Sequence, residues 1–314
     1  ISDYDVVDKT PFKKDCVQML ADACHRSGIK LFFYHSQLDW HHPDYFPHSN
    51  TGHYTGRPES GNWYAYLDYM DVQLKELLTN YGSIAGIWFD GMWDKPDADW
   101  RLNKTYSMIH NIQPAALISN NHHLQPFPGE DIQEFEKGLP GESPFGKTDY
   151  ISELPLETCE TMNNSWGYNK DDDNYKSVKD LIKYLVEAAG MDANFLLNVG
   201  PKPDGTFPEK AKELLLEIGK WLVKNGESIY GTRGGPLTAQ SWGVSTYKDN
   251  KIYLHILNEI DEVITVPIIK SEIKKINLLN GENVEYTKEE SNIILKIPKS
   301  EQDEYDTILV LTAN

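Results

Sequence analysis

An aspartate stands directly after a short apolar run and between two tryptophans in the stretch GIWFDGMW, residues 86–93. Burying a charged carboxylate costs free energy, so Asp90 needs a reason to lie there. One interpretation is structural, because an aspartate at a strand end often caps the following turn. The other is chemical: a carboxylate held rigidly at a strand end could be a nucleophile, with Trp88 and Trp93 beside it as a platform for a sugar ring.

Composition and charge limit the class of protein. The chain has 314 residues, of which 39% are hydrophobic, which favours one large domain with a sizeable core and a smaller second one. A formal net charge of −18 argues against nucleic acid or an anionic membrane surface as the main partner, because both would repel it. The acidic balance otherwise serves solubility. No apolar run approaches the roughly 18 residues that span a bilayer, and the odd number of cysteines argues against a disulfide framework.

The elements that must position Asp90 alternate between strands and helices. Short apolar runs of the buried-strand type are separated by segments whose apolar residues recur at helical spacing. The expected strands are residues 29–34, 86–89, 115–119 and 194–199, and the expected helices are residues 11–27, 63–78, 106–112, 177–190 and 208–225. This alternation predicts parallel βαβ units, in which active groups lie at the carboxyl ends of the strands. The polar residues at those ends are His35, Asp90, Asn120 and Asn198.

The pattern changes after about Gly231 to short, evenly spaced apolar runs with turn signals such as Asn280-Gly281. Such runs predict an all-β appendage, namely a small sandwich. We therefore expect an α/β fold in two domains, residues 1–231 and 232–314.

Seven ordered motifs resemble those of the α-L-fucosidases, glycoside hydrolase family 29. They are GIKLFFYHS with LDW (28–40), IWFDG (87–91), GEDIQEFE with LPG (129–141), LETC (156–159), SWGYN (165–169), NFLLNVGP with DG (194–205) and NGESIYGT (225–232). WFDG alone would be weak, but the order and spacing of all seven are specific. The resemblance implies a (β/α)8-like (TIM-type) barrel followed by a β-sandwich, and retaining exo-hydrolysis of terminal α-L-fucose without a metal or other cofactor.

The resemblance also assigns catalytic roles. Asp90 resembles the family's nucleophile, and a retaining mechanism needs a second carboxyl group about 5–5.5 Å away to protonate the leaving oxygen. Glu136, Glu157 and Asp131 are the candidates for this acid/base, in that order. Glu136 fits the family's spacing of acidic residues and a proline, whereas Glu157 follows a leucine where the family usually has a tryptophan. In an arbitrary protein, the acidic run at residues 130–136 would be a solvated loop.

Sugar contacts follow from the same resemblance. The implied substrate-binding residues are Tyr34, His35, Trp40, Trp88, His122 and Trp166. The C5 methyl group of fucose suits an aromatic surface such as Trp166, although an aromatic residue at such a place is otherwise more often part of a core. His122 stands where the family often has an arginine, and it would have to replace that arginine's contact with the sugar or the nucleophile.

The histidines after Trp40 raise the question of a metal site. His41, His42 and His48 lack the i, i+4 pairing of helical zinc sites, and adjacent histidines point in different directions, so we expect no metal. This loop is instead expected to line the cleft and to shape the subsites beyond fucose.

The family's His-Trp-Gly and Lys-His-His-Asp-Gly-Phe motifs, which bind the fucose hydroxyls, do not occur in this sequence. Residues 1–8 resemble the region just after the second motif, so we expect the sequence to be a fragment. Two alternatives remain open: an inactive carbohydrate-binding fragment or pseudoenzyme, and a hydrolase of a related sugar such as an α-L-galactosidase.

The expected partner is a fucosylated glycan, while the linkage, the aglycone and the oligomeric state are left open. The substrate class and a lysine- and tyrosine-rich, bacterial-looking composition predict a periplasmic or secreted protein.

Overall fold

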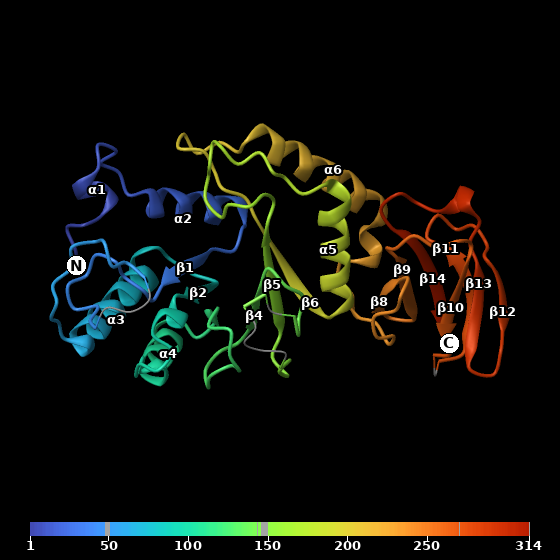
Figure 1. The fold of residues 1–314 in the computed structure, drawn as a ribbon, viewed down its shortest axis with the longest axis horizontal. Helices are drawn as coiled ribbons and strands as arrows, with labels where there is room; N and C mark the ends of the chain where they lie inside the picture. The colour runs from blue at the N-terminus through green and yellow to red at the C-terminus, as the bar shows by residue number, and fades with distance from the viewer. Residues whose placement is uncertain (48–50, 143, 146–149, 270, 314) are drawn as a thin grey trace. The chain divides into compact units, whose positions relative to one another are not determined.

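The computed structural model describes residues 1–47, 51–142, 144–145, 150–269 and 271–313 (Figure 1). The chain divides into two compact units. Unit 1 consists of Ile1–Glu134 with Phe145–Leu154, and unit 2 consists of Phe135–Pro144 with Pro155–Asn314. The predicted boundary between residues 231 and 232 lies inside unit 2.

Unit 1 is built on a parallel sheet with the strand order β1-β2-β3 (Figure 1). Its strands are β1 (Phe32–Ser36), β2 (Gly86–Asp90) and β3 (Leu117–Asn120), and its helices are α1 (Val6–Lys9), α2 (Cys16–Ser27), α3 (Trp63–Asn80), α4 (Leu102–Ile112) and the 3-10 turn η1 (Met92–Asp94). The expected strands and helices of this region are confirmed. Strand β1 starts later than predicted and ends later, so that His35 lies within the strand.

The two faces of this sheet differ. One face is covered by α2, α3 and α4, with which it forms a hydrophobic cluster. The sheet residues in this cluster include Phe33, Ile87, Phe89 and Ile118. Because side chains alternate along a strand, the other face carries Tyr34, Trp88 and Asp90. The register pairs Tyr34 with Trp88, so these two side chains are neighbours on that face.

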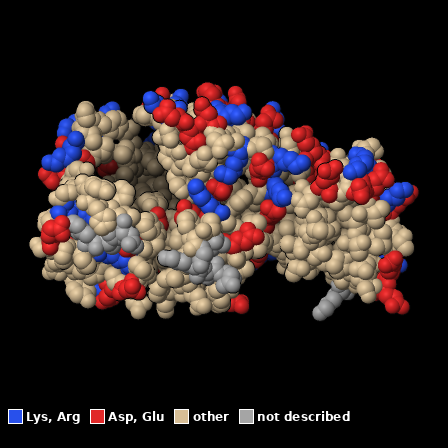
Figure 2. Space-filling model, in the orientation of Figure 1, with Lys and Arg blue, Asp and Glu red and all other residues tan. Residues whose placement is uncertain are grey.

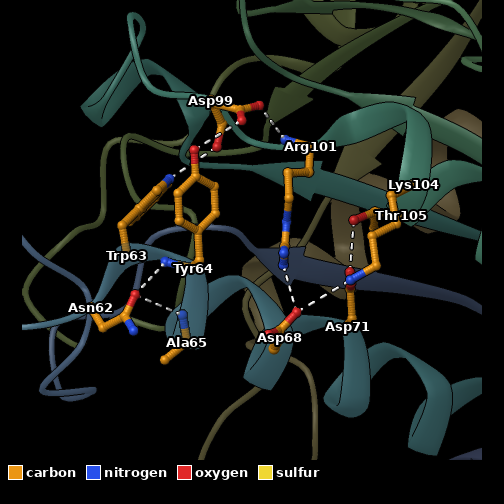
Figure 3. Close-up of polar contacts among 10 residues, drawn as sticks. All are labelled: Asn62, Trp63, Tyr64, Ala65, Asp68, Asp71, Asp99, Arg101, Lys104 and Thr105. Atoms are coloured by element: carbon orange, nitrogen blue, oxygen red, sulfur yellow. Dashed lines mark hydrogen bonds and ion pairs between the residues drawn. The ribbon is translucent and has the colours of Figure 1, made fainter.

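Polar contacts join α3 to the start of α4 (Figure 3). Asp68 lies 2.8 Å from the guanidinium of Arg101 and 3.2 Å from the ammonium of Lys104. Hydrogen bonds from Arg101 and Lys104 lower the pKa of Asp68. The buried Asp71 accepts a 2.7 Å hydrogen bond from Thr105, which orients the two helices on the sheet.

Unit 2 contains a second parallel pairing, between β5 and β6, in a sheet ordered β4-β5-β6. The elements are β4 (Gln133–Glu136), which begins in unit 1, then β5 (Leu156–Thr161), α5 (Val178–Gly190), β6 (Ala193–Asn198), α6 (Glu209–Asn225) and the 3-10 turn η2 (Gly226–Ser228). Helices α5 and α6 and strand β6 were expected, whereas β4 and β5 were not, because polar residues interrupt their apolar pattern. A capping box between Ser177 and Asp180 starts α5.

The C-terminal segment folds into two antiparallel sheets, ordered β11-β14-β9-β8-β7 and β10-β13-β12 (Figure 1). Their strands are β7 (Arg233–Gly234), β8 (Gly243–Lys248), β9 (Lys251–Ile256), β10 (Val263–Pro267), β11 (Ile273–Leu278), β12 (Glu285–Lys288), β13 (Asn292–Lys296) and β14 (Thr307–Ala313), with the 3-10 turn η3 (Lys299–Glu301). One hydrophobic cluster joins residues of both sheets, such as Leu254 and Leu295. The predicted all-β segment is therefore confirmed, with β7 and β12 in addition to the expected strands.

Helices α5 and α6 pack against the β11-β14-β9-β8-β7 sheet. A further hydrophobic cluster contains Leu181 of α5, Trp221 of α6 and the sheet residues Val244 and Val310. Strands β9 and β14 are consequently buried on both faces, which explains their largely apolar sequences.

A buried chain of hydrogen bonds extends this packing. His255 Nδ1 lies 2.6 Å from Asp306 Oδ2, and His255 Nε2 lies 3.1 Å from the Thr246 hydroxyl. That hydroxyl donates to the carbonyl of Ser228 over 2.7 Å. Since the Thr246 hydroxyl donates its proton to Ser228, its oxygen accepts from His255 Nε2. The chain thus ties β8, β9 and the segment before β14 to the end of α6.

The charges on the visible face are mixed: Figure 2 shows acidic and basic side chains interspersed over α6. Lys220 and Glu217 of that helix lie 2.6 Å apart, and Lys210 and Glu213 lie 3.7 Å apart. In the described part of the chain, no helix is both long enough and apolar enough to cross a membrane.

His35 lies on the helix-covered face of β1, and it is only 9% exposed. Its ring packs edge-on against Phe89, with the centroids 5.7 Å apart. Loss of hydration lowers the pKa of His35 to about 4, against a smaller opposing effect of Gln73 and Asp39. The ring is therefore neutral near pH 7.

This burial predicts a pH-dependent stability. The unfolded chain protonates His35 near pH 6.5, whereas the folded protein does so only near pH 4. The free energy of unfolding should therefore fall as the pH drops below about 6.5, by about 3 kcal/mol at pH 4 from this residue. Urea unfolding of the wild type and of His35→Gln, above pH 6.5 and at pH 4, measures this loss of stability. The variant should lose less stability on acidification, and equal losses would contradict the assignment.

Candidate active site

Asp90 is the last residue of β2, and the backbone turns sharply after it. Gly91 follows with φ 95°, and a Cβ atom on it would lie 2.8 Å from the Cβ of Leu38. Only glycine accommodates both the left-handed conformation and this close approach. The Asp90 carbonyl accepts a 2.6 Å hydrogen bond from the backbone N–H of Gln37, which holds the segment after β1 against the end of β2.

Among the described residues, side-chain donors reach both oxygens of the Asp90 carboxylate. The Tyr34 hydroxyl donates to Oδ2 over 2.7 Å. The Trp93 indole N–H donates to Oδ1 over 3.0 Å, and the Asn121 amide donates to the same oxygen over 3.4 Å. All three donors are neutral, so they fix the orientation of the carboxylate without cancelling its charge. An oriented, charged carboxylate is what a nucleophile at a sugar carbon requires.

An aromatic surface stands beside this carboxylate. The rings of Tyr34 and Trp88 stack, with their centroids 5.7 Å apart and their planes 23° apart. Tyr34 is 62% exposed although it is held at both its ring and its hydroxyl. The buried indole Nε1 of Trp88 has no hydrogen-bond partner among the described residues. Two predicted sugar contacts thus lie next to Asp90, and one of them has an unused donor.

His122 has hydrogen-bond partners that the sequence did not predict. Its side chain is buried, and its Nδ1 accepts a 3.0 Å hydrogen bond from the backbone N–H of Leu124. The ring proton is therefore on Nε2, which donates to the Glu130 carboxylate over 3.1 Å. With both nitrogens engaged, the ring could contact a sugar only by giving up one of these bonds. A direct contact in place of an arginine stays a prediction that this arrangement does not favour.

The Glu130 carboxylate accepts several hydrogen bonds in and around the loop that follows β3. Its carboxylate accepts hydrogen bonds from the Tyr106 hydroxyl over 2.9 Å and from the backbone N–H of Phe127 over 3.1 Å, besides that of His122. Burial first, and then the charge of Glu130, raise the pKa of Tyr106 well above its usual value. This loop carries Asn121, whose backbone N–H also donates to the Phe89 carbonyl over 2.8 Å. Glu130 thus helps to place the amide that contacts Asp90.

His35 and Asp131 are not brought to Asp90. Strand β1 extends through His35, so alternation turns this side chain to the face opposite Tyr34. The Asp131 carboxylate accepts a 2.8 Å hydrogen bond from the backbone N–H of Ile118 and lies 3.1 Å from His110 Nε2. These bonds hold Asp131 beside β3. The third acid/base candidate therefore has a structural role.

The loop after β1 presents Trp40 and the adjacent histidines. Trp40 is 51% exposed, and its indole N–H donates to the Thr51 hydroxyl over 2.9 Å. The His41 ring stacks on Tyr4, with the centroids 3.7 Å apart, and His42 Nδ1 accepts from a backbone N–H. His48 lies outside the described residues. Among those described, no group of His, Cys, Asp and Glu side chains is arranged to hold a metal ion.

The two glutamates proposed as the acid/base belong to unit 2, where their strands place them differently. Glu136 is the last residue of β4, at its carboxyl end. Glu157 is the second residue of β5, and it accepts a 2.5 Å hydrogen bond from the Asn194 amide. It lies four residues before the end of β5, about 13 Å along the strand. Because active groups of parallel sheets gather at carboxyl ends, this placement favours Glu136.

Trp166 also belongs to unit 2, in the loop after β5. It is 36% exposed, and its carbonyl accepts a 2.8 Å hydrogen bond from the Asn198 amide. The Lys137 ammonium lies 5.2 Å from the centre of its ring. Lys137 directly follows Glu136 in the chain.

Some contacts of Asp90 were missed by the sequence analysis. Trp93 was interpreted only as part of a platform, and Asn121 was not considered. Two signals for these contacts were available in the sequence. One is a donor three residues after a strand-end carboxylate, and the other is an amide directly after the neighbouring strand. Glu130 offered no signal, because an acidic loop residue is usually solvated.

Comparisons with known proteins identify the family of the chain. The family model described as Alpha-L-fucosidase matches residues 1–227. The Alpha-L-fucosidase of Dictyostelium discoideum is 26% identical over 266 residues, which cover 80% of this chain and 54% of that protein. The solved Alpha-L-fucosidase isoenzyme 1 of Paenibacillus thiaminolyticus is 34% identical with a TM-score of 0.84, and the match covers 100% of this chain and 78% of that one.

A further solved structure is an alpha-L-fucosidase of Bacteroides thetaiotaomicron, a trapped covalent intermediate in complex with 2-fluoro-fucosyl fluoride. It is 26% identical with a TM-score of 0.79, and the match covers 98% of this chain and 73% of that one. The chain spans about half the length of the curated relatives it matches. With a match over residues 1–227 and ordered motifs around Asp90, the chain belongs to the alpha-L-fucosidase family.

Proposed function

We propose that the protein removes terminal α-L-fucose from glycans with retention of configuration, with Asp90 as the nucleophile and Glu136 as the acid/base. The observation that carries this proposal is the Asp90 carboxylate at the carboxyl end of β2, oriented by Tyr34, Trp93 and Asn121. The trapped covalent intermediate of a solved relative supports a double displacement.

The proposed reaction has two steps. An Asp90 oxygen attacks the anomeric carbon of fucose while the bond to the aglycone oxygen breaks, and Glu136 gives its proton to that oxygen. Water then attacks the same carbon, Glu136 takes a proton from it, and the bond to Asp90 breaks. Tyr34 and Trp88 provide an aromatic wall beside the sugar.

The relatives also support the finer fold prediction. We propose that the parallel sheets of the two units are portions of a (β/α)8-like barrel, and that the antiparallel sheets form the family's β-sandwich. We further propose a periplasmic or secreted location, because fucosylated glycans are met outside the cytoplasm.

Removing the Asp90 carboxylate should abolish turnover. Asp90→Ala should lower kcat for 4-nitrophenyl α-L-fucoside by roughly 10⁴-fold or more, since no other group forms the covalent intermediate. Azide should restore product formation and give the inverted fucosyl azide. Release of 4-nitrophenol and nuclear magnetic resonance of the product measure both effects. Wild-type turnover that survives in Asp90→Ala would contradict the proposal, and fucose binding without wild-type turnover would indicate a binding protein.

The acid/base can be identified by its dependence on the leaving group. Glu136→Ala should lose roughly 10²–10⁴-fold in kcat/KM on a fucosyl disaccharide, whose leaving oxygen needs a proton. It should lose much less on an aryl fucoside with a good leaving group, and azide should give the retained product. Glu157→Ala is the matched comparison and should show neither signature. The opposite pattern would transfer the role to Glu157.

The Glu130 network should act on turnover through Asn121. Glu130→Gln turns an N–H group toward existing donors, and we expect it to lower kcat by about tenfold with little change in KM. In an Asn121→Ala background, the same change should add almost nothing, because coupled residues are not additive. His110→Gln alters the neighbouring half-buried contact with Asp131 and should leave kcat within about twofold. Additive effects of the Glu130 and Asn121 variants on kcat would contradict the coupling.

A further inference from the structure

Trp40 is an exposed tryptophan that is held unusually firmly. Half of its surface faces solvent, yet its indole N–H is already bonded to Thr51. With its one polar group engaged, the ring offers a flat apolar face. Such a face costs little entropy to occupy, because it is already ordered.

The bond to Trp40 continues to a buried carboxylate. The Thr51 hydroxyl that accepts from Trp40 donates to Asp94 Oδ1 over 2.8 Å. The Tyr45 hydroxyl donates to the other oxygen of Asp94, also over 2.8 Å. Asp94 is 1% exposed and Tyr45 is fully buried, so the end of this chain of bonds is part of the core.

Backbone contacts fix the same residue. A Cβ atom on Gly52 would lie 2.4 Å from Cδ1 of Trp40, so glycine is required for the indole to lie against this segment. The Asp39 carbonyl accepts a 3.0 Å hydrogen bond from the buried Arg57. The Asp39 carboxylate accepts from the backbone N–H of His41 over 2.7 Å. Contacts thus hold the residue before Trp40, the residue after it and its own ring.

Both anchors lead to the proposed nucleophile. The loop leaves β1 at Gln37, whose backbone N–H donates to the Asp90 carbonyl over 2.6 Å. Asp94 follows Asp90 by four residues, and its backbone N–H donates to the Gly91 carbonyl over 3.1 Å. The indole is therefore attached on two sides to the turn that carries Asp90.

We propose that Trp40 is the platform for the sugar ring to which fucose is linked, and that Asp94 is a positioning residue that acts on it through Thr51. This inference rests on the proposed function. The apolar face of a pyranose ring, made of C–H groups, stacks on the indole, while its hydroxyl groups remain in water. The ligand class is a fucosylated disaccharide or longer glycan, as opposed to a fucoside with a minimal leaving group.

The test compares two substrates that share fucose and differ in the leaving group. α-L-Fucosyl fluoride has a single atom beyond the sugar, whereas a fucosyl disaccharide has a neutral hexose there. Trp40→Ala should lower kcat/KM for the disaccharide by about tenfold or more, as expected for loss of a stacked aromatic. It should leave kcat/KM for the fluoride within about twofold, which matches a surface substitution. Trp40→Phe should recover part of the disaccharide activity.

Two further variants separate the platform from general loop stability. Thr51→Val removes both hydrogen bonds at constant shape and should lower disaccharide activity alone, while adding nothing in a Trp40→Ala background. Tyr54→Ala removes another fully exposed aromatic residue of the same loop and should change neither substrate. Equal losses on both substrates in Trp40→Ala, or no loss on either, would overturn the proposal.

A binding measurement keeps this outcome distinct from the proposed function. If the wild type does not hydrolyse α-L-fucosyl fluoride, the proposed function fails, and calorimetric titration then decides on the platform. Trp40→Ala should weaken binding of the disaccharide and leave binding of free fucose unchanged. Equal binding of the disaccharide by wild type and variant would overturn the proposal even then.

Discussion

The structure of unit 1 depends on a carboxylate held at the end of an apolar strand. Asp90 accepts hydrogen bonds from Tyr34 of the neighbouring strand, Trp93 of the following turn and Asn121 of the loop after β3. A charge that is partly removed from water needs such donors, and each donor requires its own element to be in place. The order β1-β2-β3 and the turn at Gly91 are what bring these elements to one point. Specificity for a ligand can then be added on the loops without disturbing the strands.

Sequence patterns predicted most of the elements around this point, because apolar periodicity directly reports burial. They did not predict β4 and β5, whose sequences QEFE and LETCET carry polar residues on strands that are nonetheless paired. They also did not predict the surroundings of two side chains. Two extra residues in β1 turned His35 to the helix-covered face, and a tautomer fixed by Leu124 turned His122 into a partner of Glu130. Both outcomes depend on contacts between distant segments, which a local pattern does not contain.

The family resemblance added what periodicity could not. It selected Asp90 from 48 acidic residues, and the hydrogen bonds at that residue agree with the choice. It left the acid/base undecided, because loop glutamates look alike in a sequence. Strand position distinguishes them physically: Glu136 is the last residue of β4, whereas Glu157 is the second residue of β5.

The cluster that joins α5 and α6 to the β11-β14-β9-β8-β7 sheet has an evolutionary consequence. The central strands of that sheet are covered on the helix side, since Val244 and Val310 pack on the helices that precede it in the chain. The Thr246 hydroxyl is also spent on the Ser228 carbonyl, across the predicted domain boundary. The C-terminal strands are therefore not an exchangeable module. Gene fusion or recombination at residue 231 would expose apolar surface on both the helices and the sheet. The sheet and the helices are therefore constrained to be inherited together.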